Sequence, residues 1–539
     1  MSAARTSRAL AAALTATALL LTGCTGASDT APDDALGAPA GHTNDITEST
    51  GGLDDVPEDL LPYYEQEITW RDCGVSGYQC ATLNAPLDHD AVDPAEDVQL
   101  AVSRIRAVGP AEERLGALLV NPGGPGSSAV DFLQNHAGTG FPAEVRARYD
   151  IVAVDPRGTG GSEPVECLDD AAMDAFTLVD RTPDDDAEID ALTNALIDFA
   201  ESCRERSGRL LEHISTTEAA RDLDLVRAVL GEERLNYYGA SYGTHLGAVY
   251  ADLFPHRSGR LVLDAGVDPR LDTLTTDLMQ AAGFEAALHE FVIDCVGHED
   301  CPILSIDDIA DLLDALDAEP LPTGEDRPLT ESLATTAIAR ALYSETVWPR
   351  LREALTPAVA VALDIEELRT EDFDEGASAT PGAPLLRLAD EYHRRDAVGA
   401  YGTVNFAFPA IGCLDRPADL TTPEDVLAAL DTFEEMAPTF GRDFAWSSLL
   451  CGVWPVEATG EPGPVRAAGA DPILVIGTTR DPATPYAWSE SLADQLESAV
   501  LLTLDGDGHG AYGTDGCVDA AVNAHLIEDL QPEPGTTCP

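Results

Sequence analysis

The pentapeptide Gly239-Ala240-Ser241-Tyr242-Gly243 constrains the fold more than any other part of this sequence. It follows a short apolar run at 235–238 and precedes a helical pattern that continues to about Phe254. In that setting a Gly-x-Ser-x-Gly pentapeptide predicts a sharp turn from a strand into a helix, because two glycines permit close packing around a strained serine. A chance match in a glycine-rich chain is the alternative, and the flanking strand and helix argue against it.

Strand and helix patterns alternate on both sides of this turn. Short apolar runs predict buried strands at 117–120, 149–154, 235–238, 261–264, 472–477 and 500–504, the last as an edge strand. Amphipathic patterns predict helices at 216–230, which Gly231 ends, and at about 520–530. This order predicts an α/β fold, a mostly parallel doubly wound sheet with helices on both faces.

The stretch between residues 271 and 465 interrupts that alternation. It consists of acidic amphipathic patterns broken by loops, without clear strand signals. We therefore expect one α/β core, formed by 56–270 and 466–539, with 271–465 inserted as a helical cap.

A serine hydroxyl is a weak nucleophile unless a base removes its proton and an acid orients that base. In folds with this strand–serine–helix turn, the chain order is serine, then acid, then histidine, each on a loop after a strand. Asp481 follows the strand pattern at 472–477, and His509 follows the one at 500–504 in a glycine-flanked loop. We assign Ser241 as nucleophile, His509 as base and Asp481 as the orienting acid.

Four other residues compete for these roles. Asp505 and Asp507 lie too near His509 to occupy a separate strand end. His525 falls in a helical pattern, which favours a structural role, and His245 lies four residues after the serine in the helix that follows it.

Acyl transfer also needs donors for the developing oxyanion. One expected donor is the backbone N–H of Tyr242, and the other comes from the glycine loop at 121–126 that follows an earlier strand. We choose Gly124, with Gly123 next. Alone, this loop would be only a tight turn.

The amino terminus is typical of an exported lipoprotein. Arg5 and Arg8 precede an apolar run too short to span a bilayer, which predicts a signal peptide at 1–23. The run ends in Leu-Thr-Gly-Cys, which resembles a bacterial lipobox with Cys24 as the lipidated residue; a plain secretory signal is the alternative. Residues 24–55 then form a solvated tether.

Ten cysteines remain once Cys24 is set aside, an even number that suits disulfides in an oxidising compartment. No pair or histidine cluster has zinc-ligand spacing, so we expect no metal and no cofactor. Sequential pairing is our hypothesis, because each neighbouring pair is separated by a short stretch within one structural unit: Cys73–Cys80, Cys167–Cys203, Cys295–Cys301, Cys413–Cys451 and Cys517–Cys538.

The charge balance excludes several functions. The formal net charge is −65, from 96 acidic and 31 basic residues, and every basic residue is an arginine. Such a chain cannot bind nucleic acid by neutralising phosphates or dock on an anionic bilayer by charge. Without lysine, Schiff-base chemistry is also excluded. We expect no nucleic-acid partner, and membrane contact only through the N-terminal anchor.

The chain resembles the secreted tripeptidyl aminopeptidases of actinobacteria, which belong with the proline-iminopeptidase-type α/β-hydrolases and include cell-envelope lipoprotein serine proteases. The motifs that carry the likeness are Asn-Pro-Gly-Gly-Pro-Gly at 121–126, Asp155-Pro-Arg-Gly, Gly-Ala-Ser-Tyr-Gly-Thr at 239–244, Leu263-Asp264 and Asp481-Pro-Ala-Thr-Pro, with Ala-Ile-Gly-Cys-Leu-Asp at 410–415 in the insertion. The likeness extends from about Trp70 to Cys538.

The resemblance implies an α/β-hydrolase fold with a helical cap and the cleavage of short peptides from free amino termini. Asn121 stands where the iminopeptidases proper have histidine, which favours the tripeptidyl-aminopeptidase branch. A carboxylate in the cap is the natural partner of a substrate ammonium group, and Asp415 is our hypothesis for that anchor, against its being one of many surface acids.

Other functions stay open at this point. They are a carboxylesterase or lipase-like hydrolase of envelope or exogenous esters, an endopeptidase acting on a specific protein, and a catalytically silent binding lipoprotein. The expected location is outside the cell, lipid-anchored at the outer face of the cytoplasmic membrane or cell envelope, with release into the medium as the alternative.

Overall fold

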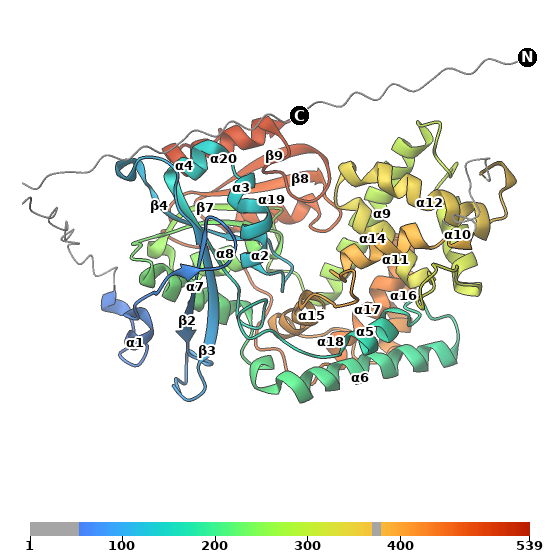
Figure 1. Ribbon diagram of the computed structural model, residues 1–539, viewed down its shortest axis with the longest axis horizontal. Coiled ribbons are helices and arrows are strands. Elements are labelled where there is room, and N and C mark those ends of the chain that lie inside the picture. Colours follow the sequence, from blue (N-terminus) through green and yellow to red (C-terminus); the bar gives the residue numbers. More distant parts are fainter. Residues whose placement is uncertain (1–52, 369–378) are drawn as a thin grey trace, which may run out of the picture. The chain divides into compact units, whose positions relative to one another are not determined.

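The computed structural model describes residues 53–368 and 379–539 (Figure 1). The predicted signal peptide, Cys24 and nearly all of the predicted tether lie outside the described residues. Among the described helices, none is both long and apolar enough to span a membrane.

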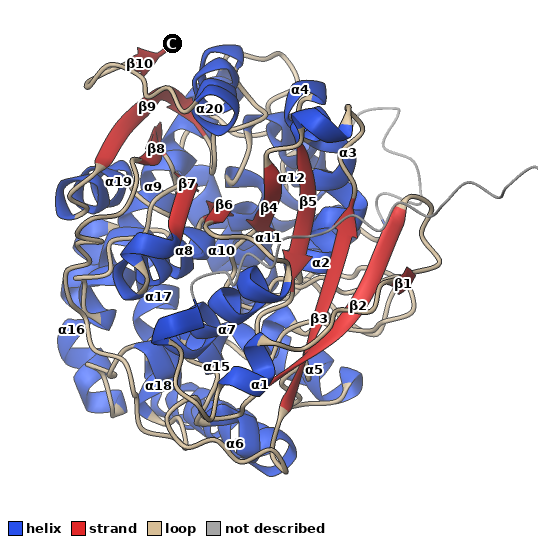
Figure 2. Ribbon diagram, turned by 90° about the vertical axis from the view of Figure 1, so that its left-hand side faces the viewer, coloured by secondary structure: helices blue, strands red, loops and turns tan. Residues whose placement is uncertain are grey.

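The core of the structure is a sheet of ten strands, with the order β1-β2-β3-β5-β4-β6-β7-β8-β9-β10 in its described part (Figure 2). The strands are β1 Arg71–Asp72, β2 Tyr78–Ala85, β3 Val98–Ile105, β4 Gly116–Asn121, β5 Tyr149–Val154, β6 Leu235–Ala240, β7 Ser258–Asp264, β8 Ile473–Arg480, β9 Ala499–Asp507 and β10 Thr537–Cys538. The strands from β5 through β10 pair in parallel, whereas β1, β2 and β3 form an antiparallel edge.

Helices cover both faces of this sheet. The described α-helices outside the stretch between β7 and β8 are α1 Leu61–Tyr64, α2 Ala129–Phe132, α3 Gly138–Gly140, α4 Ala143–Arg148, α5 Asp170–Thr177, α6 Asp186–Leu211, α7 Thr216–Val229, α8 Tyr242–Leu253, α19 Tyr486–Gln495 and α20 Gly516–Glu528. On β4, Leu119 packs into the cluster that holds α7 and α8, whereas its neighbours Leu118 and Val120 pack into the cluster that holds α20. The predicted α/β class and mostly parallel doubly wound sheet are confirmed.

Between β7 and β8 the described residues form helices and a single isolated β-bridge. These helices are α9 Thr273–Val296, α10 Asp307–Ala318, α11 Glu331–Leu342, α12 Trp348–Ala362, α14 Ala383–Tyr392, α15 Val404–Asp415, α16 Pro423–Met436, α17 Gly441–Ser447 and α18 Leu449–Gly452. Most of them gather on the right of the sheet in Figure 1. They have an apolar cluster of their own, built around Phe291, Leu312, Ile338 and Leu355.

The long helix α6 was not predicted from the sequence. Asp185 caps it in a capping box with Glu188. Its residues Leu192 and Leu196 pack with Phe433 and other residues of the insertion, so the first part of the core contributes a helix to the packing of the cap.

Two further differences concern the edges of the sheet. The antiparallel strands β2 and β3 were missed, because β2 alternates buried and exposed residues instead of forming a continuous apolar run. Strand β9 is not at the edge, because β10 pairs with it in parallel, with Thr537 opposite Thr503.

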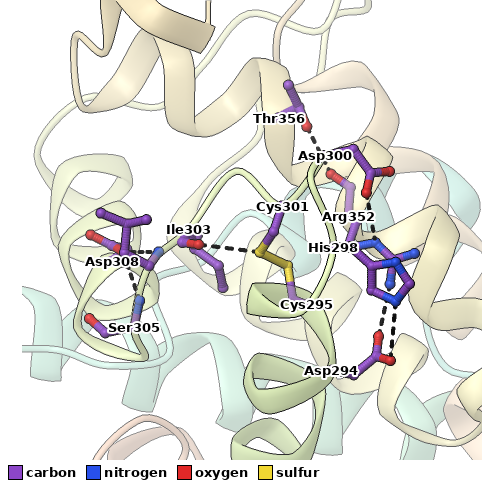
Figure 3. Close-up of a disulfide and its surroundings, with 11 residues drawn as sticks. Asp294, Cys295, His298, Asp300, Cys301, Ile303, Ser305, Asp308, Arg352 and Thr356 are labelled. Atoms are coloured by element: carbon purple, nitrogen blue, oxygen red, sulfur yellow. Dashed lines mark hydrogen bonds and ion pairs between the residues drawn. A yellow bond between two sulfur atoms is a disulfide. The ribbon is translucent and has the colours of Figure 1, made fainter.

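Five disulfides hold these elements together, and they confirm the sequential pairing: Cys73–Cys80, Cys167–Cys203, Cys295–Cys301, Cys413–Cys451 and Cys517–Cys538. Cys517–Cys538 joins α20 to β10. At the end of α9, Cys295–Cys301 closes a short loop beside Arg352 of α12, whose guanidinium contacts Asp294 at 2.8 Å (Figure 3).

Candidate active site

Ser241 lies between β6 and α8 in a strained conformation. Its φ is +57° and its ψ is −126°, a region that non-glycine residues rarely occupy. Its backbone N–H donates to the carbonyl of Asp264 at 2.9 Å, and its carbonyl accepts from the N–H of Thr244 at 2.8 Å. Hydrogen bonds on both sides therefore hold the turn in this conformation.

The two glycines of the pentapeptide are required by close contacts. A Cβ on Gly239 would lie 2.3 Å from the carbonyl oxygen of Gly243, and one on Gly243 would lie 2.8 Å from the carbonyl oxygen of Asn121. Neither position has room for a side chain. The glycines therefore allow β6, α8 and the glycine loop at 121–126 to pack closely around Ser241.

His509 follows β9, and Asp481 follows β8. The Nδ1 atom of His509 lies 2.9 Å from Oδ1 and 3.0 Å from Oδ2 of Asp481, whose side chain is fully buried. Because a carboxylate only accepts hydrogen bonds, Nδ1 carries the proton and Nε2 is left as the basic nitrogen. Burial lowers the pKa of His509, but the charge and hydrogen bond of Asp481 and the charge of Asp264 outweigh it, and the pKa is raised overall.

Neighbouring groups fix Asp481 and His509. Asp481 accepts from the N–H groups of Ala483 and Thr484, each at 2.9 Å, and from the hydroxyl of Thr484 at 3.0 Å. The N–H of His509 donates to the carbonyl of Tyr343 at 3.0 Å, and the Tyr343 ring meets the imidazole edge-on with centroids 5.4 Å apart. Tyr343 follows α11, so the insertion contacts the predicted base directly.

The competing residues lie elsewhere. Asp505 and Asp507 both pair with Arg480, each at 2.9 Å. His525 is buried in α20, where its Nε2 lies 3.0 Å from the carbonyl oxygen of Leu261. His245 lies one turn into α8, and burial lowers its pKa to about 3.

The glycine loop lies against the serine. Gly123 and Gly124 have φ of +93° and +113°, and a Cβ on Gly123 would lie 2.9 Å from Cβ of Ser241 and 3.0 Å from the N atom of Tyr242. The N–H of Gly123 donates to Oδ1 of Asn121 at 2.8 Å, so it is already engaged within the loop. This arrangement favours Gly124 over Gly123 as the loop's free donor.

Tyr242 begins α8, where backbone N–H groups have no partner within the helix. The predicted oxyanion donor is this backbone N–H and not the side chain, whose hydroxyl lies 2.6 Å from Oγ1 of Thr216.

Asp415, the predicted substrate anchor, ends α15 beside the start of α7. Its two carboxylate oxygens accept from the N–H of Thr216 at 2.7 Å and from the Thr216 hydroxyl at 2.6 Å. Burial raises the pKa of Asp415 to about 6. A second acid of the insertion, Asp277 on α9, accepts from the hydroxyl of Ser448, and burial raises its pKa to about 6 as well. The charge of Arg416 acts on both carboxylates.

Sequence reasoning missed Thr484 and Tyr343. Thr484 lies in the Asp-Pro-Ala-Thr-Pro stretch that was singled out for its aspartate, so its signal was present. Tyr343 comes from the insertion, 138 residues before Asp481, and no motif marks it.

Three groups of described side chains have ligand atoms close enough to hold a metal ion. They are Asp515, Cys517 and Cys538; Asp180, Asp317 and Glu331; and Asp184, Asp185 and Glu188. The first contains a disulfide and the third contains a helix capping box. None of them includes Ser241, His509 or Asp481.

Known proteins are similar to this chain over most of its length. Residues 437–538 match a family described as "TAP-like protein". The serine protease Hip1 of Mycobacterium tuberculosis is 33% identical over 503 residues, covering 88% of this chain and 92% of that protein. The carboxylesterase B of the same species is 34% identical, covering 88% and 91%, and the tripeptidyl aminopeptidase of Streptomyces lividans is 31% identical, covering 87% and 86%.

Proposed function

The chain belongs to the TAP-like family of α/β-hydrolases that these relatives represent, and on that premise we propose that it is an exported aminopeptidase that releases di- or tripeptides from free amino termini. It is a serine peptidase of the α/β-hydrolase superfamily. The observation that carries the proposal is the pairing of Nδ1 of His509 with Asp481 at 2.9 Å. The two residues follow the carboxyl ends of β9 and β8, and Ser241, with a φ of +57°, follows the carboxyl end of β6.

In this proposal Ser241 attacks the scissile carbonyl while Nε2 of His509 takes its proton. Asp481 holds the imidazole in the required tautomer and stabilises the imidazolium. His509 then gives the proton to the leaving amine, and an acyl-enzyme remains on Ser241. Water, deprotonated by His509, attacks the acyl-enzyme and releases the short peptide.

The oxyanion formed in both steps accepts from the N–H groups of Tyr242 and Gly124. The start of α8 supports this role, because its free N–H groups and the positive end of its dipole face the serine. Asn121 supports it indirectly by engaging the N–H of Gly123, which sets the direction of the next peptide unit.

We place the amine of the substrate near Asp415 and Asp277. A carboxylate has about four lone-pair sites, so the two bonds from Thr216 leave Asp415 able to accept an ammonium group. Asp277 is the second candidate, because its carboxylate also has a raised pKa and is held from one side by Ser448.

Three chromogenic substrates test the proposal. Purified protein is offered a tripeptide nitroanilide, the same peptide with a blocked amine, and a nitrophenyl ester, with Ser241→Ala as control. Aminopeptidase activity predicts rapid turnover of the free peptide, none of the blocked peptide, and none of any substrate by the Ser241→Ala variant. Asp415→Asn and Asp277→Asn are then compared. Substitution of the residue that binds the substrate amine raises the KM for the free peptide and leaves turnover of the nitrophenyl ester intact.

A second candidate function is ester hydrolysis, favoured by the similarity to a protein named carboxylesterase B. The same assay separates it, because an esterase turns over the nitrophenyl ester well and neither peptide. Equal cleavage of free and blocked peptides indicates an endopeptidase.

We also propose export with a lipid anchor at Cys24. Five disulfides support an oxidising compartment. Metabolic labelling with a palmitate analogue tests the anchor: the wild type takes up label and stays with membranes, whereas Cys24→Ala does neither. A labelled Cys24→Ala protein would contradict it.

A further inference from the structure

Asp264, the last residue of β7, connects the two loops of the proposed active site. Its backbone carbonyl accepts the N–H of Ser241 at 2.9 Å. Its carboxylate accepts the N–H of Ala511 at 3.0 Å and that of Tyr512 at 2.9 Å, two and three residues after His509. One residue therefore contacts both the nucleophile turn and the loop that carries the base.

The side chain of Asp264 is almost fully buried, with an exposed fraction of 1%. A third donor reaches it, the hydroxyl of Tyr238 on β6 at 3.1 Å. All three partners donate to the carboxylate, which is the pattern expected of an ionised acid. Burial works in the other direction and raises the pKa of Asp264.

The backbone beyond Asp264 is strained. Ala265 has φ of +63°, close to the +57° of Ser241, which follows the neighbouring strand, and both values are rare for non-glycine residues. The register pairs Ala240 with Asp264, so the two strained turns follow directly opposite positions of β6 and β7. Such strain persists only where surrounding contacts hold it: the carbonyl of Asp264 accepts the N–H of Ser241, and the N–H of Ala265 donates to the carbonyl of Ile476 at 3.0 Å.

The electrostatic surroundings of His509 include groups from three parts of the fold. Asp481 and Thr484 face it from the loop after β8, Tyr343 from the insertion, and Asp264 from β7. Asp264 itself is faced by His509, Tyr238 and Tyr512. The charge of Asp519 acts on both tyrosines, and that of Glu144 acts on Tyr512.

We propose that Asp264 is a second carboxylate of the active site, a positioning residue that holds the His509 loop against Ser241 and whose negative charge stabilises the imidazolium formed when His509 takes the serine proton. The proton passes from Oγ of Ser241 to Nε2 of His509, and Asp264 takes up none. This inference rests on the proposed roles of Ser241 and His509, but not on the choice between peptide and ester substrates.

The test is the pH dependence of inactivation by a fluorophosphonate, which reports the reactivity of the serine whatever the natural substrate. Asp264→Asn keeps the shape and an acceptor oxygen but removes the charge. A nearby anion favours protonated histidine, so removing it makes the base available at lower pH. We expect the acidic limb of the rate profile to move down by about 1 pH unit, and the plateau rate to fall roughly tenfold, or about 1.4 kcal/mol.

Asp155→Asn is the matched control. Asp155 directly follows β5, is 1% exposed, and accepts the N–H groups of Val130 at 2.9 Å and Gly161 at 2.8 Å. It therefore fixes the backbone as Asp264 does, but it is not among the groups that act on His509. Its acidic limb should stay at the wild-type position. An unmoved limb in folded Asp264→Asn, or an equal shift in both variants, overturns the proposal.

If Asp264→Asn does not fold, Tyr238→Phe decides the question. Tyr238→Phe keeps the ring and removes one hydrogen-bond donor, which destabilises the ionised form of Asp264. The acidic limb of the rate profile should therefore move in the same direction by a smaller amount, and an unmoved limb overturns the proposal. A wild type that the probe does not label at Ser241 would instead refute the proposed function.

Discussion

The glycine loop offers the sharpest prediction, through Gly123→Ala. Gly123 has φ of +93°, and an added Cβ would lie 2.5 Å from the carbonyl oxygen of Ala240 and 2.9 Å from Cβ of Ser241. Both distances are shorter than real Cβ contacts, and the first is to backbone. The loop must therefore move away from the serine, and the N–H of Gly124 moves with it.

Two costs follow from this change. An L-residue in a left-handed conformation costs about 1–2 kcal/mol of stability. Losing one oxyanion donor costs about 2.7–4 kcal/mol in the transition state, which lowers kcat roughly 10²- to 10³-fold. We expect the loss in kcat and little change in KM, because the donor acts on the transition state more than on the bound substrate.

Gly77→Ala separates the two costs. Gly77 has φ of +91° but has nothing within 4 Å of an added Cβ, so this variant carries the backbone strain without the collision. Steady-state kinetics and thermal melts are measured for both variants with whichever substrate the wild type turns over. If Gly123→Ala retains a kcat within about threefold of that of Gly77→Ala, the glycine loop does not supply an oxyanion donor.

Three more variants test other contacts of the structure. Thr484→Val removes the hydroxyl that donates to Asp481 at 3.0 Å; a hydrogen bond to a charged group contributes about 1.5–3 kcal/mol, so kcat/KM should fall roughly 10- to 100-fold, and wild-type kinetics would exclude this role. Arg157→Met leaves the buried carboxylate of Asp222 without the guanidinium that now contacts both its oxygens at 2.7 and 2.8 Å. Denaturant titration should show that the free energy of unfolding falls by about 3–5 kcal/mol, and a fall of less than about 1 kcal/mol would contradict this role of Arg157. Burial raises the pKa of Asp277 from 3.8 to about 6, so the stability that its protonated form contributes is present at low pH and is lost as the pH rises through 6. Asp277→Asn should therefore melt at a higher temperature than the wild type at pH 7.5 but not at pH 4. Equal melting temperatures at pH 7.5 would refute this.

The central parallel strands were predictable because the signal for each is local. Strands β4 and β5 are largely buried on both faces, so they read as continuous apolar runs that end at glycine- or proline-rich loops. The serine, acid and histidine follow such strand ends, which is why chain order alone selected Ser241, Asp481 and His509.

The features that were missed depend on contacts distant in sequence. The burial of β2 alternates along its length, because it lies near an antiparallel edge with one side exposed. Tyr343 meets His509 only because the insertion folds back onto the sheet. The side chain of Asp264 contacts residues 247 and 248 positions later, and no local pattern encodes that distance.

The release of short peptides from free amino termini by Ser241 can be followed by mass spectrometry of a decapeptide digest, sampled over time. We expect an N-terminal di- or tripeptide and the complementary shortened peptide to appear first, the N-acetylated decapeptide to stay intact, and Ser241→Ala to produce neither product. Internal cleavage of the acetylated peptide, or unchanged products with Ser241→Ala, would contradict it.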